Sequence, residues 1–288
     1  MSVVTIREFT DPRCPWAYSA EPSRWRLRWL FGDQIEWQSR MVVLSERPPT
    51  ERFDANAYSE GLRGFVSRFG MPIDTRPRSH RPVTFAACLR VVAARLHGAA
   101  GEDAGLLRRL RIRCMMGEAL DEPETVALAA REAGIDPAEL ERWAADGAVE
   151  TALRADMAAA RDPSTSALAL DHKLADADTG PSGRRYTCPS YEIERADGGR
   201  VDLPGFQPLA AYEVALANVA PELERRPDPD SVEEALRWAG EPLASAEVAA
   251  VCGLEPAQAR ERLARVALEQ PLGSDGYWTL AAGSTVSI

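Results

Sequence analysis

A cysteine at the junction of a strand and a helix is the feature that most constrains this chain. Residues 3–10 form a β-branched run with an aromatic end, which is typical of a buried strand. From Pro15 to Phe31, apolar residues recur every three or four positions, as on one face of a helix. Proline at the first helical position is a start signal, so Cys14 is expected at the N-cap, with its sulfur near the free N–H groups of Trp16 and Ala17. Because a helix N-terminus favours an anion, we expect Cys14 to ionise at lower pH than a free cysteine, as a thiol nucleophile must.

Beyond this unit the sequence predicts a second strand, a long helical block and two further strands. Residues 34–43 read as the second strand, and a proline-rich loop follows it. From about residue 56 to residue 161 there is no strand signal, and glycine or proline stands at the breaks between amphipathic segments. The expected helices cover residues 58–69, 82–96, 106–120, 123–133 and 137–157, the last interrupted near Gly147, and the later strands cover 187–193 and 201–203. This order predicts an α/β fold with a large helical insertion between its second and third strands.

The sequence Cys14-Pro15-Trp16 resembles the active-site turn of a known family. In the FrnE-like branch of the DsbA family, which has a thioredoxin fold, this turn reads Cys-Pro-Trp-Cys. Here Ala17 takes the fourth position, where the family has its usual resolving cysteine. The resemblance implies a thioredoxin-like fold in which Cys14 is the catalytic nucleophile and Pro15 and Ala17 shape the turn.

Two later segments are similar to landmarks of the same family. Residues 186–193 resemble the strand that carries its cis-proline, which would be Pro189, and residues 205–209 resemble its closing segment. In thioredoxin folds the cis-proline loop faces the active-site turn and docks the substrate as an added strand. The resemblance, which includes 2-hydroxychromene-2-carboxylate isomerase-like relatives, thus implies that Cys188 lies near Cys14.

We expect three units along the chain. Residues 1–50 and 180–220 would form the thioredoxin-like core, residues 51–179 a helical insertion that covers the active-site turn, and residues 221–288 a C-terminal extension. The extension begins with a linker rich in proline and charge. Three short helical patterns and a hairpin follow, which together resemble a winged helix.

The charge of this extension argues against a DNA-binding role. A DNA-reading helix must be basic. Here the arginines of the third helical pattern are offset by neighbouring glutamates: Arg260, Arg262 and Arg265 against Glu255, Glu261 and Glu269. We therefore expect an intramolecular cap or a contact in a homodimer.

The five cysteines have no CxxC or zinc-like spacing, and the three histidines form no local ligand motif, so no metal site is expected. Cys88, Cys114 and Cys252 are expected to be apolar fillers. Cys188 has two interpretations: a resolving or substrate-gating thiol, or a small apolar residue. The neighbours of Cys14 are also candidates for binding.

Arg13 adjoins Cys14 and is a candidate to hold the thiolate or an anionic thiol substrate. Trp16 either lines the substrate groove together with Pro189 or belongs to the core. These three residues form the expected substrate-binding set.

Composition narrows the function classes. A hydrophobic content of 45% with 27% charged residues is ordinary for a globular protein, and 288 residues suffice for two or three packed units. The net charge of -10 argues against nucleic acid and anionic membranes as partners. No apolar run approaches the roughly 20 residues of a spanning helix, and no basic-then-apolar leader precedes the first strand, so a cytoplasmic location is expected.

These features predict a thiol–disulfide oxidoreductase. The thiolate of Cys14 would attack a disulfide and form a mixed disulfide. Cys188 or an external low-molecular-weight thiol would release it, because Ala17 cannot. No tightly bound cofactor is expected, only a thiol as co-substrate. Two alternatives stay open: a glutathione-transferase-like or isomerase-like enzyme that uses a thiol cofactor, and a non-catalytic scaffold that binds proteins through the groove and the extension.

Overall fold

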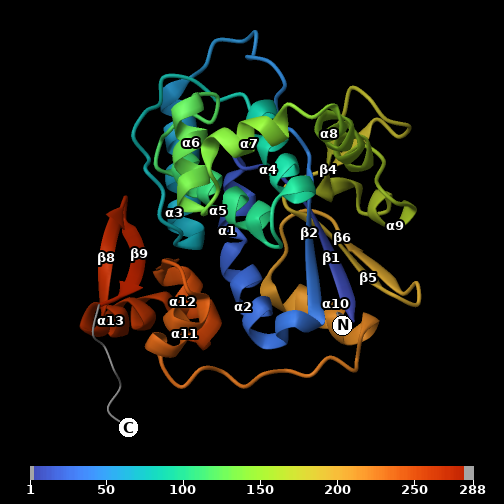
Figure 1. Cartoon of the computed structure of the whole chain (residues 1–288). Helices are drawn as coiled ribbons and strands as arrows, with labels where there is room; N and C mark the ends of the chain where they lie inside the picture. Colours follow the sequence, from blue (N-terminus) through green and yellow to red (C-terminus); the bar gives the residue numbers. More distant parts are fainter. Residues whose placement is uncertain (1–2, 282–288) are drawn as a thin grey trace.

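The computed structural model describes residues 3–281, and its centre is a four-stranded sheet in the order β2-β1-β5-β6 (Figure 1). The central strand β1 (Val4–Thr10) is parallel to β2 (Ile35–Met41) and antiparallel to β5 (Ser190–Arg195). The edge strand β6 (Arg200–Leu203) is antiparallel to β5. A βα unit at the front and a β-hairpin with a helix at the back make a thioredoxin-like fold, so the expected fold class is confirmed.

Alternation along β1 divides its side chains between the two faces of the sheet. Val4 and Ile6 are buried on one face, in the same apolar cluster as Trp25 of α2 (Glu21–Phe31). The helix after the last strand, α10 (Leu209–Val219), contributes Tyr212 and Leu216 to that cluster. Phe9 belongs to a second cluster with Cys14, Cys188 and Tyr186. The carboxyl end of β1 therefore delivers the chain directly into the cysteine site.

The helix expected over Pro15 to Phe31 is two helices. The first, α1 (Pro15–Ser19), has Ala20 as its C-cap, and α2 begins at Glu21. Pro22 lies in the first turn of α2 and has no N–H to continue the hydrogen bonds of α1 across the junction. A short 3-10 helix, Gly32–Gln34, leads into β2.

The insertion follows its predicted helices closely. It contains α3 (Ala55–Phe69), α4 (Phe85–His97), α5 (Glu102–Met115), α6 (Pro123–Glu132), α7 (Pro137–Ala144), α8 (Gly147–Ala160) and α9 (Thr165–Leu168). The buried apolar side chains of α3 to α7 and most of those of α8 form one cluster that also includes Tyr18 of α1, whereas Ala167 of α9 belongs to the cluster around Cys14. In Figure 1 these helices lie above the sheet, at the end where the active-site turn begins.

A small hairpin between α9 and β5 was not expected. A 3-10 turn at Asp171–Lys173 precedes β3 (Leu174–Asp176), which pairs with β4 (Arg184–Tyr186). The sequence here reads as a polar loop, because three-residue strands are too short to show alternation. The hairpin leads directly to Cys188.

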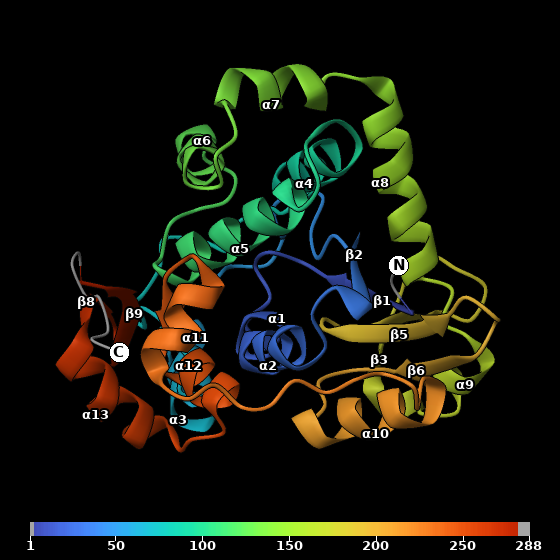
Figure 2. The same cartoon turned by 60° about the horizontal axis from the view of Figure 1, so that its bottom comes forward.

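The C-terminal extension packs onto α2. It contains α11 (Val232–Ala239), β7 (Leu243–Ala244), α12 (Ser245–Cys252), α13 (Pro256–Val266), β8 (Ala267–Leu272) and β9 (Asp275–Leu280). The strands form a sheet in the order β7-β9-β8. Figure 2 shows α1 and α2 between this extension and the central sheet. The expected intramolecular contact is present; the winged-helix comparison stays an interpretation.

Polar contacts hold the linker and extension to α2. The indole Nε1 of Trp29 donates to the carbonyl oxygen of Pro227 at 2.8 Å, and Arg26 donates to the carbonyl of Val251 and to Asp228. Trp238 of α11 lies edge-on to Trp25 and Trp29, with ring centroids 5.7 and 5.1 Å away.

Within residues 3–281, no helix is both long and apolar enough to cross a membrane.

Candidate functional site

Cys14 lies where the strand–helix junction was predicted to place it. It is the N-cap of α1, with Pro15 at the first helical position, and only 5% of it is exposed. The backbone N–H of Cys14 donates to the carbonyl of Asp11 at 3.1 Å, which closes the turn after β1. The prediction of an N-cap cysteine is confirmed.

Cys14 and Cys188 meet although 174 residues separate them. The thiol of Cys14 donates to the carbonyl oxygen of Cys188 at 3.2 Å. The peptide bond between Cys188 and Pro189 is cis, as the family resemblance implied. Cys188 is 6% exposed and Pro189 is buried. Cys188 and Pro189 thus face Cys14 at the start of α1.

The two protonation states of Cys14 use different partners. Only a thiol can donate to the Cys188 carbonyl; a thiolate must accept instead. The thiol of Cys188 is the donor that matters most, and its hydrogen bond lowers the pKa of Cys14. Burial opposes this effect, and the backbone N–H groups of Ala17 and Trp16 add to it. The pKa of Cys14 is lowered overall.

The pKa of Cys188 moves in the opposite direction. Burial is the main cause of its increase, and the interaction with Cys14 adds to it. At neutral pH Cys188 is therefore a neutral thiol, which can donate a hydrogen bond to the Cys14 sulfur. The interactions at this point thus favour ionisation of Cys14 and oppose ionisation of Cys188.

Asp11 organises the turn, and the sequence interpretation missed this role. Its buried carboxylate accepts from the backbone N–H groups of Arg13 and Leu44, each at 2.8 Å, and from the Thr84 hydroxyl at 2.7 Å. These contacts join the active-site turn to the loop after β2 and to the start of α4. An Asp-Pro pair just after a strand is a recognisable turn signal, but its long-range partners are not visible in the sequence.

Aromatic side chains surround Trp16, which is 37% exposed at the start of α1. Its ring centroid lies 4.9 Å from Phe65, 5.6 Å from Phe69 and 5.5 Å from Phe206. The guanidinium of Arg68 lies over the indole at 5.6 Å. Trp16 is thus part of an exposed aromatic wall beside Cys14.

A hollow of about 330 Å³ opens between this wall and the cis-proline loop. Trp16 and Phe206 form one side, and Cys188 lies on another. Its polar lining includes Arg68, His172 and Lys173. Because these residues come from distant segments of the chain, their spacing in the sequence does not show that they share a site.

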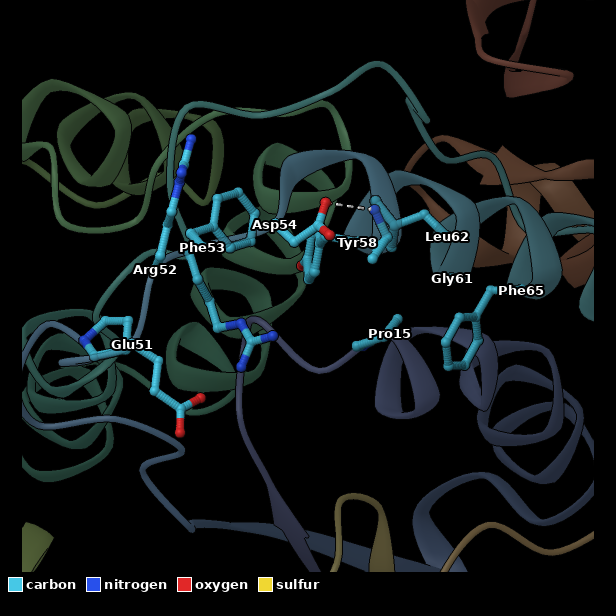
Figure 3. Close-up of a pocket in the computed structure, with 12 residues that line it drawn as sticks. Pro15, Glu51, Arg52, Phe53, Asp54, Tyr58, Gly61, Leu62 and Phe65 are labelled. Carbon is cyan, nitrogen blue, oxygen red and sulfur yellow. Dashed lines mark hydrogen bonds between the residues drawn. The ribbon is translucent and has the colours of Figure 1, made fainter.

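A second hollow, of about 440 Å³, opens beside Pro15 at the start of α1 (Figure 3). Figure 3 shows Pro15 and Phe65 near one end and Phe53 with Tyr58 farther along. The rings of Phe53 and Tyr58 are 5.4 Å apart. Pro15 of the turn and Phe65 of the aromatic wall thus also line this second hollow.

Arg13 points toward a different part of the site. Its guanidinium donates to the Ser45 hydroxyl at 3.1 Å and to the carbonyl of Pro82. It therefore ties the turn to two loops. Its proposed contact with a thiolate or an anionic substrate stays a prediction.

The other cysteines lie in the surrounding structure. Cys88 and Cys114 are fully buried in the insertion, and burial raises the pKa of both thiols, that of Cys114 to about 11. Cys252 is half-buried at the end of α12. Across residues 3–281, no group of three His, Cys, Asp or Glu side chains is arranged to hold a metal ion.

A strand that delivers a cysteine onto a helix start, opposite a cis-proline, defines a thioredoxin-fold protein with a thiol site. The family model of the DSBA-like thioredoxin domain matches residues 5–164, more than half of the chain. The chain belongs to this family. No curated protein matches it at a significant level.

Solved structures share its fold at low sequence identity. A putative protein disulfide isomerase from Nitrosomonas europaea has a TM-score of 0.57 at 13% identity, with 75% of this chain and 96% of that chain covered. A probable DsbA oxidoreductase from Streptomyces coelicolor has a TM-score of 0.52 at 19% identity, covering 78% and 92%. The cytosolic disulfide reductase DsbM from Pseudomonas aeruginosa has a TM-score of 0.50 at 16% identity, covering 74% and 99%.

Proposed function

We propose that the chain is a thiol–disulfide oxidoreductase in which the Cys14 thiolate is the nucleophile. The observation that carries this proposal is the contact of Cys14 with Cys188 at the start of α1. There a buried sulfur has a hydrogen-bond donor and two backbone N–H groups to stabilise its negative charge. Such stabilisation is what a reactive cysteine requires.

In the first step the Cys14 thiolate attacks one sulfur of a substrate disulfide. A bond forms between Cys14 and that sulfur, the substrate S–S bond breaks, and the other substrate sulfur leaves as a thiolate. The leaving thiolate takes its proton from the solvent, and the neutral thiol of Cys188 lies beside the reacting sulfur as a hydrogen-bond donor. Exchange conserves electrons, so no redox cofactor is needed.

The second step releases the mixed disulfide by one of two routes. Either the Cys188 thiolate attacks the Cys14 sulfur, which breaks the mixed disulfide, expels the substrate thiolate and leaves an internal disulfide that two external thiols later reduce, or an external thiolate attacks the substrate sulfur of the mixed disulfide and expels the Cys14 thiolate. The raised pKa of Cys188 slows the first route, because the thiolate is the attacking species. The hollow beside Cys188 supports the second route, since it offers cationic groups to a small anionic thiol. The DsbM fold neighbour was solved with GSH, a thiol of this class.

Turnover measurements test the proposal. Reduction of a small disulfide, with glutathione as the external thiol, should require Cys14 and stop in Cys14→Ser. A trapped adduct of Cys14 with half of the disulfide should appear in mass spectra of the intact protein. Cys252→Ser, which removes a thiol far from the turn in sequence, is the matched control and should retain activity. Full activity of Cys14→Ser would exclude Cys14 as the nucleophile.

Peptide mapping after mild oxidation separates the two release routes. We expect a Cys14–Cys188 cross-link, because the cis-proline loop brings the second residue against the helix start. A disulfide requires Cα atoms within about 7 Å and converging Cβ atoms. Adducts of Cys14 with small thiols, and no cross-link, would leave only the external route.

An enzyme that uses a thiol cofactor is the second candidate. The alanine at position 17 leaves the turn with one cysteine, and the hollow beside Cys188 has the size of a small-molecule site. Thiol-dependent turnover of electrophiles, with none of disulfides, would favour this candidate over the first.

A further inference from the structure

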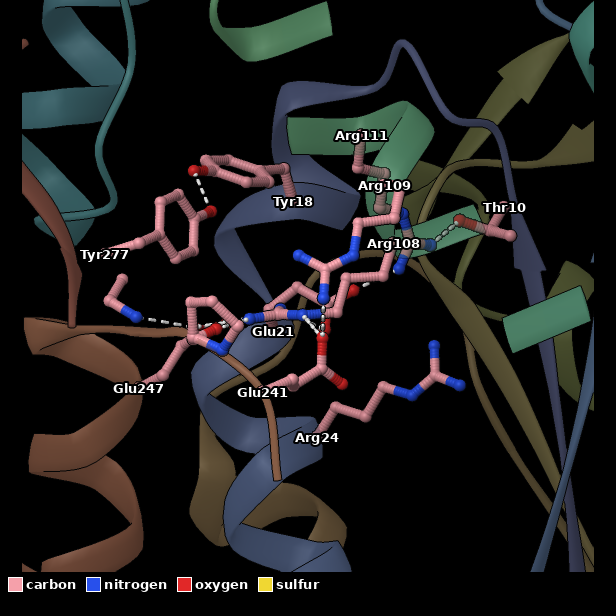
Figure 4. Close-up of polar contacts among 12 residues, drawn as sticks. Thr10, Tyr18, Glu21, Arg24, Arg108, Arg109, Arg111, Glu241, Glu247 and Tyr277 are labelled. Carbon is pink, nitrogen blue, oxygen red and sulfur yellow. Dashed lines mark hydrogen bonds and ion pairs between the residues drawn. The ribbon is translucent and has the colours of Figure 1, made fainter. Parts of the chain in front are cut away.

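The C-terminal extension contacts the active-site helix through a pair of buried tyrosines. The hydroxyl oxygen of Tyr277, on β9, lies 2.6 Å from that of Tyr18, on α1. Figure 4 shows the two hydroxyl groups facing one another. Tyr18 donates its own proton to the carbonyl oxygen of Pro72 at 2.7 Å. Since each hydroxyl has one proton, Tyr277 must be the donor to Tyr18.

Tyr18 belongs to the turn that Cys14 begins. Its backbone N–H donates to the carbonyl oxygen of Cys14 at 3.1 Å, which is the first helical hydrogen bond of α1. A helix of five residues has few such bonds, so its orientation depends on what holds its side chains. Tyr18 is fully buried and fixed from two sides, by Pro72 and by Tyr277. A chain of two hydrogen bonds therefore joins the extension to Cys14.

The hairpin of the extension also touches the segment after α3. Gly273, at the turn between β8 and β9, has φ +62, and a Cβ there would lie 2.2 Å from the carbonyl oxygen of Ile73. The adjacent residue Pro72 is the acceptor for Tyr18. The helix before this segment carries Phe65 and Phe69 of the wall around Trp16. The hairpin thus supports both the helix start and its aromatic wall.

Ion pairs anchor the extension in this position. Glu247 of α12 accepts from Arg108 of α5 at 2.7 and 3.0 Å, and neither side chain is more than 6% exposed. Arg108 also lies 3.5 Å from Glu21, at the start of α2. These buried ion pairs hold the extension, and with it Tyr277, against α1 and α2 (Figure 4).

We propose that Tyr277 is a positioning residue for Cys14. Its hydroxyl holds Tyr18, and through it the first turn of α1, so that the N–H groups of Trp16 and Ala17 stay directed at the Cys14 sulfur. The inference rests on the proposed function only in taking Cys14 as the reacting thiol. Residues at the C-terminal end of the chain would then set the reactivity of a cysteine near its beginning.

The tyrosine pair keeps its hydrogen bonds over the pH range in which Cys14 ionises. Burial raises the pKa of Tyr18 and of Tyr277, so both remain hydroxyls there. The charged groups that face the pair are Glu247 and Arg108, which pair with each other, and Glu21. A change in the titration of Cys14 therefore reports on its own surroundings, which include Asp11 and Cys188.

Alkylation of Cys14 at a series of pH values tests the proposal. Full-length wild type, Tyr277→Phe and Tyr18→Phe are treated with iodoacetamide, and the rate at the Cys14 peptide is followed by mass spectrometry. Both variants should move the midpoint of the rate profile upward by about half a pH unit, which lowers the rate about threefold well below the midpoint. Two variants break the same hydrogen bond from opposite sides, so a folding defect in one does not remove the test.

Ser245→Ala is the matched control. Ser245 makes buried hydrogen bonds to Asp275 and to Trp278, all inside the extension, so its loss loosens the extension without touching Tyr18. Its midpoint should equal that of wild type. An unchanged midpoint in the tyrosine variants, a downward shift, or an equal shift in Ser245→Ala would each overturn the proposal.

The alkylation assay needs no turnover, so its result is separate from that for the proposed function. A low wild-type midpoint that moves in the tyrosine variants, with no disulfide turnover, leaves the positioning role intact and removes the oxidoreductase. Turnover that depends on Cys14, with a midpoint that does not move, removes only the positioning role. A wild-type midpoint at the ordinary value for cysteine would remove both.

Discussion

Cys14 is almost entirely buried, so its reactivity depends on a small number of neighbouring atoms. Backbone N–H groups at a helix start are common surroundings for such a sulfur. The unusual neighbour is Cys188, whose thiol lowers the pKa of Cys14 by a hydrogen bond, whereas the fourth position of the turn is Ala17 and has no thiol. Acidity at this site therefore comes from a residue distant in sequence.

Replacing Cys188 with alanine should raise the pKa of Cys14. The hydrogen bond from Cys188 is the largest contribution that lowers this pKa, and burial, which raises it, remains in the variant. At a pH below the midpoint the variant should thus contain less thiolate. Ultraviolet titration of the thiolate, with Cys14→Ser as the blank, measures the midpoint.

Cys114→Ala serves as the control for this titration. Cys114 is a buried thiol of α5, and it is absent from the interactions that shift Cys14. Its removal should leave the Cys14 midpoint unchanged. A midpoint in Cys188→Ala that stays the same or falls would show that the Cys188 thiol does not stabilise the Cys14 thiolate.

The sequence predicted elements where local signals are strong. Proline and glycine mark the ends of the insertion helices, and α6 and α7 begin at the prolines expected, Pro123 and Pro137. The break between α1 and α2 was missed, because the pattern of apolar residues continues across Ala20. The hairpin β3–β4 was missed, because strands of three residues are too short to show alternation.

Some residues of the candidate site could likewise be predicted from the sequence, and others could not. Cys14 and its N-cap position follow from a local pattern, and Pro189 was placed by resemblance to a family. Arg68, Lys173 and Phe206 approach the same hollow from three parts of the chain, and only the folded structure brings them together. Side chains that meet through tertiary packing leave no mark in the spacing of a single sequence.

A substitution at Gly180 tests whether the close contact between the β3–β4 hairpin and the end of α8 stabilises the fold. Gly180 has φ +100, and a Cβ there would lie 2.1 Å from the carbonyl oxygen of Arg161. Gly180→Ala should lower the free energy of unfolding by about 1–3 kcal/mol, because the new methyl group displaces the backbone and the residue adopts a strained φ. Urea denaturation followed by circular dichroism measures the change.

Gly183→Ala is the control on the same hairpin. Gly183 also has a positive φ, of +65, but a Cβ there would meet nothing within 4 Å. It should therefore lose only the conformational part, about 1 kcal/mol. Equal losses in the two variants would mean that the approach to Arg161 has no energetic weight.

A series of buried ion pairs joins β1, α2, α5 and α12. Arg111 of α5 donates to Glu8 of β1 at 2.6 Å and also pairs with Glu21 of α2. Arg108, on the same face of α5, continues the series to Glu247 of the extension. Burial alone would raise the pKa of Glu21, but the arginines outweigh it and lower the pKa. The series links the sheet, the insertion and the extension.

Arg111→Met should destabilise the whole fold. The substitution leaves Glu8 and Glu21, which are 2% and 4% exposed, without their main partner. Removing one member of a buried ion pair costs about 3–5 kcal/mol, because the remaining charge is uncompensated. The free energy of unfolding in urea measures the loss.

Arg154→Met provides the comparison for an exposed pair. Arg154 binds Glu46 and Glu150 on the surface, where such pairs contribute about 1 kcal/mol or less. A loss in Arg111→Met no greater than that in Arg154→Met would contradict the structural weight given to the buried ion pairs.

The shared core of the first strand and the C-terminal extension has a consequence for synthesis on the ribosome. Val4, Ile6 and Trp25 belong to the same apolar cluster as Leu263 and Trp278. At roughly 5–20 residues per second, translation takes about 15–60 seconds to supply the last of these partners. Until then the apolar face of α2 that the C-terminal extension covers is exposed in the nascent chain. The chain is therefore prone to aggregate until the extension has been made.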